Sequence, residues 1–241
     1  MLSRLYPWAA ALAAVVLFAA SAQGASTPTT GKIVARYDFD GTRLASVLDE
    51  SGLGHNLTVV SSQAGALKLI THGTGQAFAF PAPCTGKTCA RVALRSPSSA
   101  DLNPGTANIA YGAAVELGAT QTSKGQNVVQ KGYSATSSQY KLQVDGKAGL
   151  PSCVLVDNRK PAIQLVRSSI TVADGNWHTV ECRRVAGSLS ILVDGTLRGT
   201  RAIPVALSIR NDQPLAIGGK GAYRDNDQFR GALDDVWVRI G

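Results

Sequence analysis

The sequence predicts an all-β protein in which two antiparallel sheets pack face to face. Glycine accounts for 25 of the 241 residues, methionine for one, and glutamate occurs only at Glu50, Glu116 and Glu181. Helix formers are therefore scarce, whereas residues that favour strands and turns are abundant. Hydrophobic residues make up 44% of the chain, which excludes a wholly disordered protein. All-β sandwiches often reach this length as a single domain.

Thirteen short apolar or alternating segments predict strands, and residues typical of turns separate them. No apolar i, i+3, i+4, i+7 pattern continues for three helical turns, and only Thr42–Leu48 suggests a single helical turn. The predicted strands, in chain order, are Ile33–Phe39, Asn56–Val60, Ala77–Phe80, Ala90–Leu94, Ile109–Leu117, Asn127–Gln130, Tyr140–Val144, Cys153–Val156, Ala162–Val166, Trp177–Val185, Leu189–Val193, Leu215–Ile217 and Leu233–Ile240.

Alternation within two of these strands predicts which residues face the core. Val180, Cys182 and Arg184 share one face of their strand, and Val236, Val238 and Ile240 share one face of the last strand. We interpret Trp177 and Trp237 as residues that pack in the core or on a sheet face rather than as sugar platforms. His178 is interpreted as a hydrogen-bonded strand residue rather than a catalyst.

The first 24 residues predict a secretory signal peptide. Arg4 precedes the apolar stretch Trp8–Ala20, and small residues follow, with cleavage after Ala22 or Gly24. An uncleaved membrane anchor is the alternative, but thirteen helical residues reach about 20 Å and the hydrocarbon core is roughly 30 Å thick. We therefore expect a secreted protein, with residues 25–31 as a flexible leader and residues 32–241 as one domain.

The charge balance is basic both before and after removal of the signal peptide. Residues 1–24 contain one charge, at Arg4, so the mature chain keeps 23 basic and 16 acidic residues, a net charge of +7. One interpretation is an ordinary solvated basic surface. The other is attraction to an acidic extracellular polymer. Nucleic acid is disfavoured as a partner because export separates the chain from it.

Four cysteines in an exported chain predict disulfides. Cys84 and Cys89 flank four residues and form a small closed loop, while Cys153 and Cys182 lie in two predicted strands. We therefore pair Cys84 with Cys89 and Cys153 with Cys182, although three pairings are possible. Zinc is the alternative, but neither pair has the compact spacing that structural zinc sites use.

Six blocks of sequence occur in an order that resembles a known family. The chain contains, in turn, Tyr37–Gly41 (YDFDG), Asp49–Leu57 (DESGLGHNL), Asp174–Val180 (DGNWHTV), Leu189–Gly195 (LSILVDG), Pro214–Gly219 (PLAIGG) and Phe229–Val236 (FRGALDDV). Over roughly residues 32–240 these blocks resemble laminin-G-like domains of the concanavalin A-like lectin/glucanase superfamily. The resemblance implies a jelly-roll sandwich, and its function is open because the superfamily includes lectins, adhesion modules and enzymes.

The resemblance also implies one structural calcium ion. Jelly-roll relatives often hold a hard cation between oxygens near the first strand and an aspartate in the last strand. Asp234 matches that last-strand acid, and Asp40 and Asp49 are the expected partners near the first strand. The alternative is that Asp40 and Asp49 only cap turns.

The sequence favours binding over catalysis. Relatives that hydrolyse glucans carry acids in alternate positions of one strand, so that both point into one groove, and neither Glu116 nor Glu181 has such a partner. We expect a secreted, lectin-like module that recognises carbohydrate or a cell-wall surface, with Tyr133, Tyr140 and Tyr223 as candidates for stacking on sugars. A polysaccharide hydrolase or lyase, and an adhesion module without glycan affinity, are the alternatives.

Overall fold

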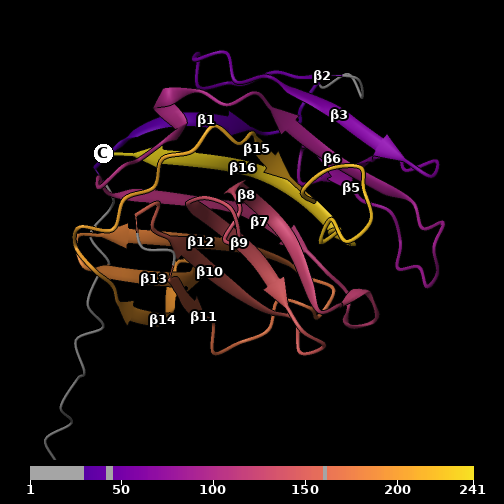
Figure 1. The fold of residues 1–241 in the computed structure, drawn as a ribbon. Helices are drawn as coiled ribbons and strands as arrows, with labels where there is room; N and C mark the ends of the chain where they lie inside the picture. The colour runs from indigo at the N-terminus through magenta and orange to yellow at the C-terminus, as the bar shows by residue number, and fades with distance from the viewer. Residues whose placement is uncertain (1–29, 42–45, 160–161) are drawn as a thin grey trace, which may run out of the picture.

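The computed structural model describes residues 30–41, 46–159 and 162–241 and confirms the all-β prediction (Figure 1). These ranges contain two short 3-10 turns, η1 (Ala100–Leu102) and η2 (Ala119–Gln121), and sixteen strands. The strands are β1 (Lys32–Tyr37), β2 (Ser46–Val47), β3 (Leu57–Ser62), β4 (Lys68–His72), β5 (Gly75–Ala79), β6 (Arg91–Ser96), β7 (Ile109–Glu116), β8 (Gly125–Gly132), β9 (Gln139–Asp145), β10 (Leu150–Val156), β11 (Ile163–Arg167), β12 (Trp177–Val185), β13 (Ser188–Val193), β14 (Thr196–Ala202), β15 (Leu215–Ile217) and β16 (Ala232–Ile240).

The strands form two antiparallel sheets, which we call sheet A and sheet B. Sheet A has the order β14-β13-β12-β7-β16-β5-β4, and β1 pairs with the C-terminal half of β16. Sheet B has the order β11-β10-β9-β8-β15-β6-β3-β2. Consecutive strands are joined either by hairpins within one sheet or by crossings to the other sheet, and the two layers are visible in Figure 1.

One hydrophobic core lies between the two sheets. Its large side chains include Tyr37, Phe78, Tyr111, Tyr140 and Phe229, all of which are at most 1% exposed. The Cys153–Cys182 disulfide crosses this core and links β10 of sheet B to β12 of sheet A. The Cys84–Cys89 disulfide closes the loop between β5 and β6, so both pairings are the ones that the sequence predicts.

All thirteen predicted strands are present, two of them (β12 and β15) with the predicted boundaries and the others with changed boundaries, and three further strands were not predicted. β2 is only two residues long and occupies part of the segment in which a helical turn was expected; residues 42–45 of that segment lie outside the described residues. β4 and β14 are exposed edge strands whose side chains do not alternate between buried and exposed, so the sequence carries little strand signal there.

Two predictions for the N-terminus concern residues that the structure does not describe. These are the signal peptide over residues 1–24 and nearly all of the leader over residues 25–31. Within the part of the chain that the structure does describe, no helix has the length and apolar character needed to cross a membrane.

His178 joins two of the sequence blocks and is a hydrogen-bonded strand residue, as predicted. Its Nδ1 lies 2.8 Å from Asp194 Oδ2, and its Nε2 lies 3.1 Å from Asp174 Oδ1. Burial alone would lower the pKa of His178, but the hydrogen bonds and negative charges of the two aspartates outweigh burial and raise that pKa. Burial raises the pKa of Asp194, but the hydrogen bonds from His178 and Thr179 outweigh burial and lower that pKa. Hydrogen bonds from Asn176, joined by the one from His178, bring the pKa of Asp174 to about 2.

These shifts predict a pH-dependent contribution of His178 to stability. Because the pKa of His178 is higher in the folded protein, its stabilisation is complete below the unfolded pKa of about 6.5 and is lost as the pH rises through the folded value. We expect His178→Gln to destabilise the protein most near pH 6, and we expect the difference in melting temperature from the unmodified protein to shrink towards pH 9. A difference that stays constant over this range would show that His178 is not charged in its contact with the aspartates.

Candidate functional site

The outward side of sheet A has a floor of small residues along its central strand, β7. The outward residues of β7 are Ala110, Gly112, Ala114 and Glu116, whereas Tyr111 and its alternate neighbours face the core. Ala110 and Ala114 are at most 5% exposed although they point away from the core. Larger side chains on the neighbouring strands therefore cover the sides of this small-residue floor. We call the outward side of β7, β12 and β16 the sheet A face.

The backbone register assigns the side chains on the two sides of this floor. Each outward residue of β7 lies between one residue of β12 and one of β16. In rows that run across the sheet, these trios are Trp177–Glu116–Ala232, Thr179–Ala114–Asp234, Glu181–Gly112–Trp237 and Arg183–Ala110–Arg239.

Trp237 lies directly over the glycine in the floor. A Cβ atom placed on Gly112 would be 3.1 Å from Cζ2 of Trp237 and 2.6 Å from the carbonyl oxygen of Val180, so no larger residue fits without a shift. Beside the indole a groove of about 190 Å³ is lined by residues that include Ala114, Glu181 and Trp237. The absence of a side chain at Gly112 is therefore what lets an aromatic ring lie flat on the sheet.

A β-bulge in β16 places Trp237 on this face. The pairing of β16 with β7 shifts register between Asp234 and Trp237, and Asp235 adopts a left-handed φ of 44°. In a regular strand, residues three apart point to opposite faces; the extra residue of a bulge brings them to the same face. Asp234 and Trp237 consequently share the sheet A face, while Val236 and Val238 pack in the core as predicted.

His72 and Trp177 meet across the central strand. His72 ends β4, which lies on the β16 side of β7, and Trp177 begins β12 on the other side. Their rings stack with centroids 3.9 Å apart and planes 20° from parallel. His72 Nδ1 also lies 2.6 Å from Asp234 Oδ2, so the imidazole is fixed on two sides and in turn fixes one face of the indole.

Asp234 is the carboxylate that binds the imidazole of this stack. Its side chain is 8% exposed, and its second oxygen accepts a hydrogen bond from the amide of Asp235 at 2.7 Å. Burial raises the pKa of Asp234 by more than the hydrogen bonds from His72 and Asp235 lower it. Further along the face, Glu181 accepts a hydrogen bond of 2.7 Å from Arg183 Nε. Both carboxylates therefore hold neighbouring side chains in place.

Of the three tyrosines that the sequence nominates for sugar stacking, one is excluded. Tyr140 is fully buried, and its ring packs against Tyr111 at 5.2 Å inside the core, so it offers no surface to a ligand. The alternation of Tyr140 with Leu142 and Val144 in β9 already carried this signal.

Tyr133 and Tyr223 do come together, at the outward side of sheet B. Tyr223 is 48% exposed, burial raises its pKa, and a hydrogen bond with Tyr133 raises it further. The row beside them runs from Arg95 through Ala216 and Gln130 to Lys141, in the register of β6, β15, β8 and β9. Long polar side chains therefore flank one small residue on this surface, unlike the run of small residues in β7.

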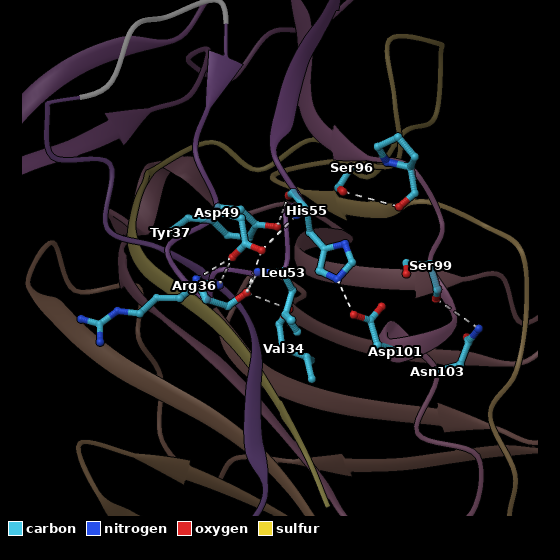
Figure 2. Close-up of polar contacts among 12 residues, drawn as sticks. Val34, Arg36, Tyr37, Asp49, Leu53, His55, Ser96, Ser99, Asp101 and Asn103 are labelled. Atoms are coloured by element: carbon cyan, nitrogen blue, oxygen red, sulfur yellow. Dashed lines mark hydrogen bonds and ion pairs between the residues drawn. The ribbon is translucent and has the colours of Figure 1, made fainter.

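The three aspartates expected to hold calcium have separate partners. Asp49 accepts hydrogen bonds from the amides of Arg36, Ser51 and His55 and from the Ser51 hydroxyl, at 2.7–3.1 Å (Figure 2). Asp40 accepts one from the amide of Gln76 at 2.6 Å, and Asp234 is bound to His72.

These contacts do not fit a calcium site built from Asp40, Asp49 and Asp234 together. Over residues 30–41, 46–159 and 162–241, no group of three or more His, Cys, Asp or Glu side chains is arranged to hold a metal ion. Asp49 instead caps its own turn, as the alternative interpretation of the sequence proposes. Calcium binding itself stays an untested prediction, and its measurement is a melting curve of the dialysed protein with and without a chelator.

Sequence reasoning assigned the aromatic residues of the sheet A face to packing. Trp177 and Trp237 do lie on a sheet face, and both are only half-buried. The missed signal was the run of small residues at alternate positions of β7, Ala110, Gly112 and Ala114, which leaves room above the strand. His72 carried no local signal, because its contact with Trp177 joins strands far apart in the sequence.

Comparison with solved structures shows the same fold in several binding domains. The binding domain of Paraclostridial Mosquitocidal Protein 1 aligns with a TM-score of 0.65 and 13% identity, over 86% of this chain and 48% of that one. The binding domain of Botulinum Neurotoxin DC, solved in complex with SialylT, gives a TM-score of 0.61 and 13% identity, over 86% and 48%. This chain thus spans about half the length of these two toxin domains.

A third similar structure matches over nearly its full length. Domain 4 of AbnA, a GH43 extracellular arabinanase from Geobacillus stearothermophilus solved in complex with arabinotriose, aligns with a TM-score of 0.64 and 16% identity, over 88% of this chain and 93% of that one. At these identities the likeness concerns the fold. No curated protein matches the chain.

A match to a family model assigns the chain to a family. The laminin-G-type model of the concanavalin A-like lectin/glucanases superfamily matches residues 90–239, which is more than half of the chain. The sandwich topology and the sequence blocks within that range agree with the match. The chain belongs to the concanavalin A-like lectin/glucanase superfamily.

Proposed function

We propose that the protein is a secreted, lectin-like module that binds a neutral polysaccharide along the sheet A face without cleaving it. The observation that carries the proposal is the small-residue floor of β7 between two half-buried indoles, Trp177 and Trp237. Apolar ring faces beside fixed polar groups are the usual composition of a small-molecule or sugar site. The two disulfides and the predicted signal peptide support an extracellular location.

The spacing of the indoles favours a chain of sugars over a single sugar. Trp177 and Trp237 lie in rows four residues apart along β7, which corresponds to about 14 Å along the strands. One sugar ring would contact only one of them. The fixed His72–Trp177 stack reduces the ordering cost of binding, since the ring is already held in one orientation.

The solved arabinanase domain suggests the first ligands to test. That domain has this fold and was solved with arabinotriose. Calorimetric titration of the protein with oligosaccharides of arabinan, xylan and β-glucan, each neutral, tests the proposal. Saturable binding to at least one of them is expected. No binding to any of them, with a folded protein, would overturn the proposal in favour of an adhesion module without glycan affinity.

The buried position of Asp234 argues against hydrolysis. A glycosidase needs two carboxyl groups that reach the scissile bond. Glu116 is next to Asp234 on this face, but Asp234 is only 8% exposed and has partners on both oxygens. We expect no release of reducing sugar from the polysaccharide that binds best. Release above that of a heat-inactivated control would instead identify the protein as a hydrolase.

A further inference from the structure

A second hollow lies at one end of the sandwich, away from the floor of the sheet A face. It has a volume of about 660 Å³ and is lined by three loops: residues 83–89, which the Cys84–Cys89 disulfide closes, residues 121–125, and residues 224–230. We call it the end cavity. Gln121 Nε2 donates to the carbonyl oxygen of Arg230 at 2.9 Å and connects two of the loops.

The end cavity adjoins the end of the sheet A face at which Trp177 lies. Gly231, the residue after Arg230, packs so closely against the carbonyl oxygen of Glu116 that a Cβ atom would lie 1.9 Å from that oxygen. Glu116 is in the same row as Trp177. A polymer that leaves the face past this row therefore reaches the loops of the end cavity.

Cations predominate in the lining of this cavity. Four basic side chains and two acidic ones line it. Both acids have partners: Lys220 Nζ lies 2.6 Å from Asp227, and Arg224 Nε lies 3.9 Å from Asp225. Among the described residues, no carboxylate lies within 4.0 Å of the other three cations, Arg91, Lys124 and Arg230.

Arg91 and Arg230 are both held by the disulfide-closed end of the β5–β6 connection. Arg91 is 9% exposed and donates from Nη1 to the carbonyl oxygen of Cys89 at 2.8 Å. Arg230 donates from Nη1 to the carbonyl oxygen of Ala82 at 3.0 Å. A guanidinium has five donors, so these contacts leave donors of each group to point elsewhere.

The two guanidiniums line the same cavity and carry like charges. Burial lowers the pKa of Arg230, and the positive charge of Arg91 lowers it further. Two like charges in a partly desolvated hollow are costly unless an opposite charge lies between them. Paired guanidiniums with free donors are the arrangement that recognises carboxylate, sulfate and phosphate oxygens.

We propose that the end cavity binds an oxyanion of an acidic polysaccharide, with Arg91 and Arg230 as the direct contacts and Lys124 at the rim. This site is separate from the groove on the sheet A face, which binds neutral sugars in the proposed function. It would give the protein an additional preference for charged sugars. The choice of a polysaccharide as the source of the oxyanion rests on the proposed function. The net charge of +7 expected for the chain without residues 1–24 favours the approach of such a polymer.

Titration with matched oligosaccharides tests the proposal. The probes are oligogalacturonate, its fully methyl-esterified form, which lacks the charge, and a sulfated dextran oligosaccharide. We expect the full chain to bind at least one charged probe more than tenfold tighter than the esterified one. Arg230→Gln removes charge-assisted hydrogen bonds and should weaken that binding by about tenfold or more, with Lys124→Gln weakening it less. The preference between the carboxylated and sulfated probes identifies the oxyanion.

Lys32→Gln is the matched control for net charge. Lys32 is exposed and begins β1, which pairs with the end of β16 opposite the cavity. We expect it to leave binding of the charged probes unchanged. Equal losses in Lys32→Gln and Arg230→Gln would overturn the site, because the effect would then follow net charge alone. Stronger binding of duplex DNA, lost in Arg230→Gln, would overturn the polysaccharide as the partner.

Two outcomes separate this site from the proposed function. If Arg230→Gln weakens binding of the charged probes while Trp177→Ala leaves binding of every neutral oligosaccharide unchanged, the end-cavity site is supported and the proposed groove is wrong. If binding of neutral oligosaccharides depends on Trp177 while charged and esterified galacturonates bind equally, the groove is supported and the end-cavity site is wrong. Because Arg91 is buried, Arg91→Gln is informative only as a folded protein, and Arg230→Gln carries the test.

Discussion

Trp177→Ala is expected to weaken binding of the best neutral oligosaccharide at least 30-fold. An aromatic residue that acts as a binding hot spot commonly contributes about 2 kcal/mol or more, which corresponds to roughly this factor. The substitution also removes the ring on which His72 stacks, so the fixed stack is lost together with the platform. Isothermal titration calorimetry with the neutral oligosaccharides measures the effect.

Two variants define what the loss means. Trp177→Phe keeps an aromatic face at the same position and should retain most of the affinity. Tyr223→Ala removes an exposed ring from the outward side of sheet B and should change the affinity less than threefold. If Tyr223→Ala abolishes binding and Trp177→Ala does not, the ligand lies on sheet B, at a residue that the sequence nominates for sugar stacking.

Removal of the disulfide between the sheets is expected to have the largest effect on stability. Cys153 and Cys182 are 29 residues apart, and for a loop of this length the chain-entropy model gives about 3.6 kcal/mol. In a domain of this size each kcal/mol corresponds to about 2–4 °C of melting temperature. We therefore expect Cys153→Ala combined with Cys182→Ala to lower the melting temperature by about 7–14 °C, measured by circular dichroism.

The second disulfide is the internal control for this prediction. Cys84 and Cys89 are five residues apart, and the same model gives about 2.2 kcal/mol for so short a loop. This pair closes a loop at the surface and does not cross the core, so its removal should cost less than removal of the other pair. An equal or larger loss from the Cys84–Cys89 pair would show that the crossing between the sheets is not the main covalent constraint.

The sequence predicts the strands well because their information is local. Alternation identifies the core residues of β12 and β16, and turn residues mark most strand ends. The cysteine pairing also follows from sequence, because one pair is close together and the other lies in two long strands. Edge strands such as β14 escape prediction because neither of their faces is buried.

The site is harder to predict because its contacts are long-range. Periodicity places Trp177 and Trp237 on the outward face of their strands, but it does not show which strand lies between them. That strand is β7, and its small residues convert a packed sheet face into a groove. The contact between His72 and Trp177 depends on where the β4–β5 hairpin lies in sheet A.

The aspartates show what a resemblance between sequence blocks leaves open. Their positions in the blocks suggest shared ligation of a cation, which stays a prediction, whereas the structure shows that Asp49 accepts hydrogen bonds from its own turn. Asp194 binds His178 on the neighbouring strand. The backbone amides of the turn therefore fix the position of a carboxylate in such a block. Such a carboxylate can bind a metal ion only through oxygen lone pairs that these amides leave free.

Tryptophan fluorescence during a titration tests the central claim most directly. Of the three tryptophans, Trp8 lies in the predicted signal peptide, so Trp177 and Trp237 are the two in the mature chain. Both lie on the sheet A face. The groove predicts that the neutral oligosaccharide with the highest calorimetric affinity changes the tryptophan emission saturably, with the same dissociation constant. Calorimetric binding with unchanged emission would place the ligand elsewhere and contradict this account.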